Sequence, residues 1–157
     1  MTMRLVMLLV RFFRLIKTVF WSFLSVLIAG GFGKGCRVNG RSKFTPETTV
    51  GDFCHFNGIV VLGRQNLLIG DHFHSGFNLV ILTDSHNYKS EVLPYDDTFI
   101  PGPVTIGDFV WCGLNVTILP GVNIGDRVIV GAGSVVTKSI PAGSIVAGNP
   151  AKIIGRR

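Results

Sequence analysis

The sequence is poor in charge, and its few basic residues are unevenly placed. Charged side chains make up 15% of the 157 residues and apolar ones 47%, which excludes a disordered chain. The first 30 positions contain no acid and carry Arg4, Arg11, Arg14 and Lys17, four of the six net positive charges. The other 127 residues hold 11 basic and 9 acidic side chains. Because basic and acidic side chains are nearly balanced, this part of the chain lacks the basic stripe of a nucleic-acid-binding domain, and we expect no nucleic-acid partner.

Cysteine is also scarce. Cys36, Cys54 and Cys112 are odd in number and widely spaced, so they form no zinc pattern and no obvious disulfide framework. Each falls at an inward position of the repeat described below. We therefore expect three small buried side chains in a reducing compartment.

No apolar run is long enough to cross a bilayer without charge. Residues 5–29 are apolar apart from Arg11, Arg14 and Lys17, and the uncharged stretch 18–29 is shorter than the roughly 20 residues that a bilayer requires. For residues 1–30 we favour a basic amphipathic helix, of which residues 1–29 lie on an anionic membrane surface. A helix packed on the domain or in an oligomer, and a cleaved signal peptide, stay open as alternatives. Residues 31–157 then form the single remaining domain.

A six-residue repeat dominates the rest of the chain. Six apolar residues are spaced by six, and a valine stands two positions before each of the first five: Ile106, Cys112, Ile118, Ile124, Val130 and Val136. The same pattern occurs earlier in Val38, Phe44, Val50, Phe56 and Leu62, then, after one inserted residue, in Ile69, Ser75 and Ile81. Residues two apart on a strand face the same side, and glycines suit the turns between strands.

This period predicts an all-β fold, a parallel β-helix of short strands. A period of six is not helical, and each turn buries its apolar side chains only against neighbouring turns. Three hexads make one turn, so residues 32–139 give about five turns once the interruption is removed. The pattern lapses between Ile81 and Val104 in a polar segment with three prolines. We predict a loop extruded from the coil over about residues 83–103, a common location for function.

The segment 104–154, VTIGDFVWCGLNVTILPGVNIGDRVIVGAGSVVTKSIPAGSIVAGNPAKII, resembles the hexapeptide-repeat acyltransferases. The similarity is greatest to the maltose and galactoside O-acetyltransferases and to the acetyltransferases of exopolysaccharide synthesis, and it covers about residues 32–155. It implies a left-handed β-helix, a homotrimer with active sites between subunits, acetyl-CoA as donor and a hydroxyl or amino group as acceptor. It implies no metal cofactor. In a related carbonic anhydrase, two of the zinc-binding histidines are five residues apart, and no two histidines here have that spacing.

The resemblance also assigns site residues. The family's catalytic histidine precedes its Val-Trp-Ile-Gly segment, which places His86, in TDSHNY, in that role. Imidazole can accept a hydroxyl proton at neutral pH, as attack on a thioester requires. By motif, the residues expected to bind acetyl-CoA are Trp111, Gly113, Ala132, Thr137, Lys138 and Lys152. Leu114 stands where some relatives have a serine.

For the acceptor, relatives often have an asparagine at the position of Asn78. Tyr88, Tyr95, Asp96 and Asp97 of the loop either form a polar, aromatic pocket for sugar hydroxyls or only hold the loop. We predict O-acetylation of a sugar or glycan, including a lipid-linked polysaccharide intermediate, at the cytoplasmic face of the membrane, since CoA is cytosolic. N-acetylation of an amino sugar or small-molecule amine, and a non-catalytic β-helix scaffold, are the alternatives.

Overall fold

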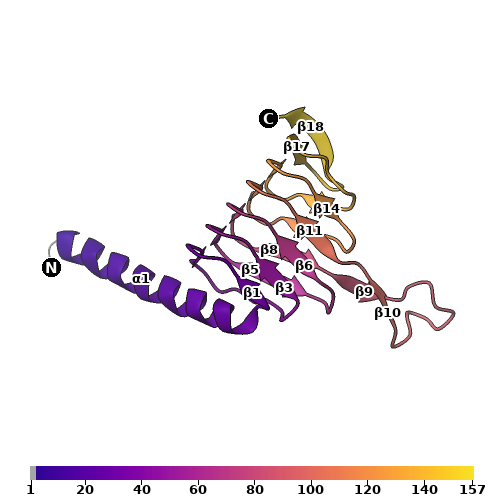
Figure 1. The fold of residues 1–157 in the computed structure, drawn as a ribbon, viewed down its shortest axis with the longest axis horizontal. Helices are drawn as coiled ribbons and strands as arrows, with labels where there is room; N and C mark the ends of the chain where they lie inside the picture. The colour runs from indigo at the N-terminus through magenta and orange to yellow at the C-terminus, as the bar shows by residue number, and fades with distance from the viewer. Residues whose placement is uncertain (1–2) are drawn as a thin grey trace.

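The computed structural model describes residues 3–157; Met1 and Thr2, the first residues of the predicted 1–30 segment, lie outside them. The predicted parallel β-helix is confirmed (Figure 1). Its first face is a five-stranded sheet of β1 (Gly31–Phe32), β3 (Thr48–Val50), β6 (Leu67–Ile69), β11 (Val104–Ile106) and β14 (Asn123–Ile124).

The second face is a seven-stranded sheet of β2 (Arg37–Val38), β4 (His55–Phe56), β7 (His74–Ser75), β12 (Trp111–Cys112), β15 (Ile129–Val130), β17 (Ser144–Ala147) and β18 (Lys152–Arg156). The third face is a four-stranded sheet of β5 (Ile59–Leu62), β8 (Leu79–Leu82), β13 (Thr117–Ile118) and β16 (Val135–Val136). We call the junction from the first to the second face the first corner, as in residues 51–54. The second corner follows the second face, as in residues 113–116, and the third corner follows the third face, as in residues 137–139.

The repeat positions form the core. All six residues of the 106–136 series are at most 2% exposed, as are the valines that precede the first five. The coil has about six turns rather than five, because it continues beyond residue 139 through the bridge of Ile124 with Ile140 and through β17. The repeat is hidden there, since the corner after β16 shifts the inward positions to Ile140, Ser144 and Val146.

The predicted register is wrong in one strand. In β5 the buried residues are Ile59 and Val61, whereas Leu62 is 40% exposed. The corner before this strand has only Asn57 and Gly58, and Gly58 has a φ of +119°. Glycine adopts this backbone without a Cβ clash, so the corner is shortened by one residue and the side chains of β5 exchange faces.

Aspartates build the first corner. The Asp71 carboxylate accepts a hydrogen bond from the N–H of Asp52 at 2.7 Å, and the Asp108 carboxylate accepts one from Asp71 at 2.8 Å. The residue before each aspartate is glycine because a Cβ at Gly70 would lie 2.3 Å from an Asp108 carboxylate oxygen. The recurrent Ile-Gly-Asp sequence is therefore a consequence of stacking one turn on the next.

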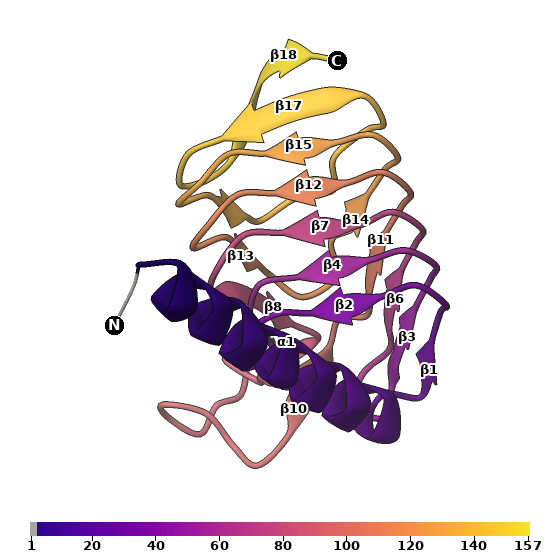
Figure 2. The same ribbon diagram turned by 90° about the vertical axis from the view of Figure 1, so that its left-hand side faces the viewer.

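The two ends of the coil are covered differently. At the last turn, β18 pairs antiparallel with β17. At the first turn lies α1 (Met3–Ile28), which crosses the β2 end of the seven-stranded sheet (Figure 2). Trp21 packs against the core, and the Ser22 hydroxyl accepts a hydrogen bond from the N–H of Val38 at 3.0 Å. Within residues 3–157, no helix combines the length and the apolar character needed to span a membrane.

The extruded loop is confirmed, and its base is more regular than expected. β9 (Asp84–His86) and β10 (Phe99–Pro101) form an antiparallel hairpin that leaves the coil between β8 and β11. Figure 1 shows this hairpin projecting from the side of the β-helix. Cys54 and Cys112 are buried as expected, but Cys36 is partly exposed because the first turn has no preceding turn to cover it.

Candidate functional site

A groove of about 460 Å³ runs along the second corner. The corner segment after β7 begins with Gly76, that after β12 with Gly113 and that after β15 with Gly131, so no side chain fills this edge. The close stacking of one turn on the next requires glycine at these positions, since a Cβ at Gly113 would lie 2.7 Å from the backbone N of Ala132. The packing of the coil thus creates the groove.

Three of the predicted acetyl-CoA residues line this groove: Trp111, Gly113 and Ala132. Trp111 is 51% exposed and lies in register between His74 and Ile129 on the outer face of the seven-stranded sheet. Leu114, also half-exposed, adds an apolar surface. The groove suits a narrow ligand with apolar and polar parts.

The predicted catalytic residue, His86, is exposed on the hairpin. Its ring stacks on Tyr95 with centroids 4.0 Å apart and packs against Phe99 at 4.6 Å. No group within residues 3–157 forms a hydrogen bond with either imidazole nitrogen. The two aromatic rings fix the plane of the imidazole, and its nitrogens remain free for a substrate.

Arg64, which the sequence analysis did not identify, supports the base of the hairpin. Its guanidinium lies 3.7 Å from the centre of the Phe99 ring, and its Nε lies 3.8 Å from the Asp84 carboxylate. The Asp84 carboxylate also accepts a hydrogen bond from the Arg64 N–H at 3.0 Å. The Arg64 guanidinium and the His86 ring therefore both pack on Phe99.

The remaining predicted acetyl-CoA residues lie elsewhere. Thr137 and Lys138 follow β16 and are exposed at the third corner, the edge from which the hairpin departs after Thr83. Lys152 is exposed on β18, opposite Ala147. The four-stranded sheet separates the third corner from the groove, so a single chain does not bring His86 onto Trp111.

The predicted acceptor residues have mixed placements. Tyr95 contacts His86, whereas Tyr88 is 68% exposed and Asp97 is exposed without a hydrogen bond in the described chain. Asp96 accepts hydrogen bonds from the side chain and N–H of Thr98, which lower the pKa of this carboxyl. It therefore stabilises the loop.

Asn78 lies in the second corner rather than beside His86. It has a φ of +58°, and its side-chain amide donates to the Asn115 side chain at 3.0 Å. Asparagine tolerates the left-handed backbone that this corner requires, which explains its presence locally.

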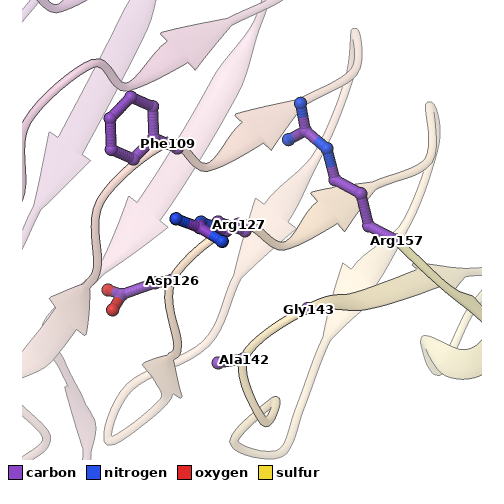
Figure 3. A pocket seen from close by; sticks show the side chains of 6 residues that line it. All are labelled: Phe109, Asp126, Arg127, Ala142, Gly143 and Arg157. Carbon is purple, nitrogen blue, oxygen red and sulfur yellow. The ribbon is translucent and has the colours of Figure 1, made fainter.

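A cavity of about 710 Å³, larger than the groove, is lined by no predicted site residue. It opens at the first corner between Phe109, Arg127 and Arg157, with Asp126, Ala142 and Gly143 (Figure 3). The Asp126 carboxylate there accepts the N–H of Asp108 at 2.9 Å and so belongs to the corner ladder. Volume alone does not identify the site.

Several known proteins are similar to this chain. A family model, the hexapeptide repeat of succinyl-transferase, matches residues 103–138. An Escherichia coli K12 protein named for O-acetyl transfer in lipopolysaccharide biosynthesis, WbbJ, is 42% identical, with 78% of this chain and 66% of its own length aligned. Another from that organism, WcaF, named for acetyl transfer in colanic acid biosynthesis, is 33% identical over 87% of this chain and 74% of its own.

A solved structure from Vibrio cholerae, a hexapeptide-repeat-containing acetyltransferase complexed with acetyl-CoA, superposes with a TM-score of 0.75 and 31% identity. The match covers 86% of this chain and 75% of that one. The chain spans just under two thirds of WbbJ and about half the length of several other curated relatives.

Proposed function

Because the chain belongs to the hexapeptide-repeat acyltransferases, we propose that it transfers the acetyl group of acetyl-CoA to a hydroxyl group of a sugar or glycan. The observation that carries this proposal is the groove of the second corner, walled by Trp111 and floored by Gly113 and Ala132. Its mostly apolar lining, with the polar side chains of Asn57 and His74 at one end, suits the pantetheine arm of CoA. The related acetyltransferase from Vibrio cholerae was solved in complex with acetyl-CoA, which supports the same donor.

His86 supplies the base. A free imidazole nitrogen accepts the hydroxyl proton while the hydroxyl oxygen attacks the thioester carbonyl carbon. The tetrahedral intermediate then collapses and the C–S bond breaks; the sulfur takes the proton back from the His86 imidazolium, so CoA leaves as the free thiol and the imidazole is neutral again. Stacking on Tyr95 and Phe99 limits rotation of the ring, which favours a productive orientation.

The site lies between two subunits of a homotrimer. Within one chain, His86 and Lys138 occupy the third corner while Trp111 occupies the second. In a cyclic oligomer, the third corner of one subunit can face the second corner of the next. The donor then lies in the groove between them, where Thr137, Lys138 and Lys152 can meet its polar and phosphate groups.

The acceptor reaches the enzyme at the cytoplasmic face of a membrane. The half of α1 that precedes Trp21 exposes large apolar side chains, Phe12 and Phe13 among them, with Arg11 and Arg14 on the same helix. Apolar and basic side chains on one helix favour an anionic membrane surface. A lipid-linked polysaccharide intermediate is therefore the acceptor that we expect.

The release of free thiol from acetyl-CoA tests this function, with sugars and glycan intermediates as acceptors. We expect acceptor-dependent release that falls by about 10²–10⁴-fold in His86→Ala, because a positioned base contributes that much. His72→Asn is the matched control, since His72 is an exposed histidine that stacks between Phe53 and Phe109 at the first corner. It should retain full activity.

Two results would contradict the proposal. Release that requires an amine acceptor would make the protein an N-acetyltransferase. Absence of both release and CoA binding by calorimetry would leave a non-catalytic scaffold.

A further inference from the structure

A second cavity, of about 610 Å³, separates α1 from the first turn of the coil. One face of the helix lines it, with residues three and four apart from Arg11 to Ser22, and Cys36, Arg37 and Asn39 line the opposite side. Figure 2 shows α1 crossing this end of the seven-stranded sheet. The cavity belongs neither to the groove nor to the hairpin.

Three arginines, Arg11, Arg14 and Arg37, line this arginine cavity, and no acidic residue of the described chain does. The ion pairs found in the described chain are Lys34–Asp52 and Arg64–Asp84, so none of these arginines is neutralised by a carboxylate. Arginines in a cluster bind phosphate oxygens through paired N–H groups. The cavity is therefore suited to a phosphate or diphosphate.

A row of polar side chains runs from the arginine cavity to the groove. The Thr18 hydroxyl bonds to the Asn39 side chain at 3.1 Å, and the Asn39 amide donates to the Asn57 side chain at 3.1 Å. Asn57 in turn lies 3.5 Å from His74 Nε2. Asn39 lines the arginine cavity whereas Asn57 and His74 line the groove, so one row of polar side chains joins the two.

The strand register gives the spacing. Arg37 pairs with His55, His55 with His74, and His74 with Trp111, all on the outer face of the seven-stranded sheet. Three strand spacings separate Arg37 from Trp111 by about 14 Å, the reach of one or two sugar rings beyond a phosphate. Partial burial, with His74 and Arg37 nearby, lowers the pKa of His55, so the arginines carry the positive charge.

An apolar surface adjoins the arginines. A cavity of about 420 Å³ is lined only by Leu15, Ile16, Val19, Phe20 and Phe23. Leu15 and Val19 line both cavities. A ligand that places its phosphate among the arginines can therefore lay an attached hydrocarbon chain along the same helix.

We propose that the arginine cavity binds the phosphate or diphosphate through which a sugar acceptor is linked to a lipid, with the sugar directed along His55 and His74 toward Trp111. This assignment rests on the proposed acetyl transfer in the groove and names the class of acceptor. Phospholipid head groups carry the same phosphate chemistry, and the experiment separates the two sources.

Binding to the full-length protein in detergent is measured by calorimetry with geranyl diphosphate, geraniol and inorganic pyrophosphate. We expect geranyl diphosphate to bind at least about tenfold more tightly than either other probe, since only this probe offers both a diphosphate for the arginines and a hydrocarbon chain for the apolar surface of α1. Arg14→Gln and Arg37→Gln should each weaken this binding about tenfold. Arg127→Gln, an arginine of the first-corner cavity, should leave it unchanged.

Alkylation of Cys36 locates the probe, because this thiol lines the same cavity and is partly exposed. Geranyl diphosphate should slow its alkylation in the wild type and not in Arg37→Gln. Equal affinity for geraniol, or arginine-dependent binding to phosphatidylglycerol vesicles without affinity for geranyl diphosphate, would overturn the assignment.

The transferase function and the arginine site can be contradicted independently of each other. Arg37→Gln should leave transfer to a water-soluble sugar unchanged and impair transfer to a lipid diphosphate sugar. If His86→Ala abolishes transfer while Arg37→Gln affects neither acceptor, the function stands and the arginine site fails. If geranyl diphosphate binds as expected but no acceptor releases thiol, the arginine site stands and the transferase function fails.

Discussion

At the scale of single residues, the first position of the second corner has different residues, with different roles, in different turns. The residue that opens the second corner is asparagine in the first two turns, Asn39 and Asn57, and glycine in the next three. Asparagine side chains fill the edge and bond to each other, whereas glycine leaves it open. A repeat that is nearly uniform inside thus varies its outer surface to make a site.

Cys36 differs from the other two cysteines in the pKa of its thiol. Hydrogen bonding with Cys54, chiefly through its side chain, lowers the pKa of Cys36 to about 7 against the effect of partial burial. Burial raises the pKa of Cys112 to about 12. Because the thiolate is the reactive form, we expect iodoacetamide to label Cys36 first, with a rate that rises through about pH 7. Peptide mass mapping over pH 5–9 checks this; prior labelling of Cys112 would contradict it.

Residues that act across turns were the hardest to foresee. His86 was predicted from its motif, but its neighbour Phe99 is 13 positions away and Arg64 lies a full turn earlier. Their association depends on the stacking of turns and on the pairing of β9 with β10. Neither the period nor the composition contains that information.

At the scale of elements, the hexad period predicted the strands of residues 104–136 because every corner there has the same length. It failed in β5, where a two-residue corner moved Val61 inward, and after β16, where Ile140 took over the inward position. Apolar residues on both faces of β5 offered no signal of the change.

The groove can be tested as an element by filling it. Ala132 is exposed in the groove and Ala142 is exposed at the first corner, so the same substitution at both positions is a matched pair. We expect Ala132→Phe to raise the KM for acetyl-CoA at least about tenfold, because the ring occupies the space of the pantetheine arm. Ala142→Phe should keep the wild-type KM. Equal KM values in both variants would show that the donor binds elsewhere.

The first half of α1 can be deleted while the residues that attach the helix to the coil are kept. Trp21 and Ser22 hold the helix to the coil, so a variant lacking residues 1–16 should unfold at nearly the wild-type temperature. It should lose most of its sedimentation with phosphatidylglycerol vesicles, because the basic and apolar side chains go together. Sedimentation equal to that of the full chain would contradict the membrane role of the helix.

At the scale of the whole molecule, the residues of the proposed reaction lie on two different edges of the β-helix. His86 and Lys138 share the third corner, and Trp111 and Ala132 share the second. The proposed homotrimer accounts for this division, because a neighbouring subunit could bring the two edges together. The sequence motif contained both halves of the site but not their separation.

Complementation between two impaired variants, assayed at acetyl-CoA concentrations well below the KM, tests this account most directly. His86→Ala and Ala132→Phe each disable a different edge, and they are mixed in equal amounts, unfolded and refolded together. A site between subunits then combines an intact His86 with an intact groove in about one quarter of cases, so we predict recovery of about 25% of wild-type thiol release. Variants that are refolded separately and mixed afterwards should keep the low activity of the two variants. Activity of the co-refolded mixture no higher than that of the separate variants would contradict a site shared between chains.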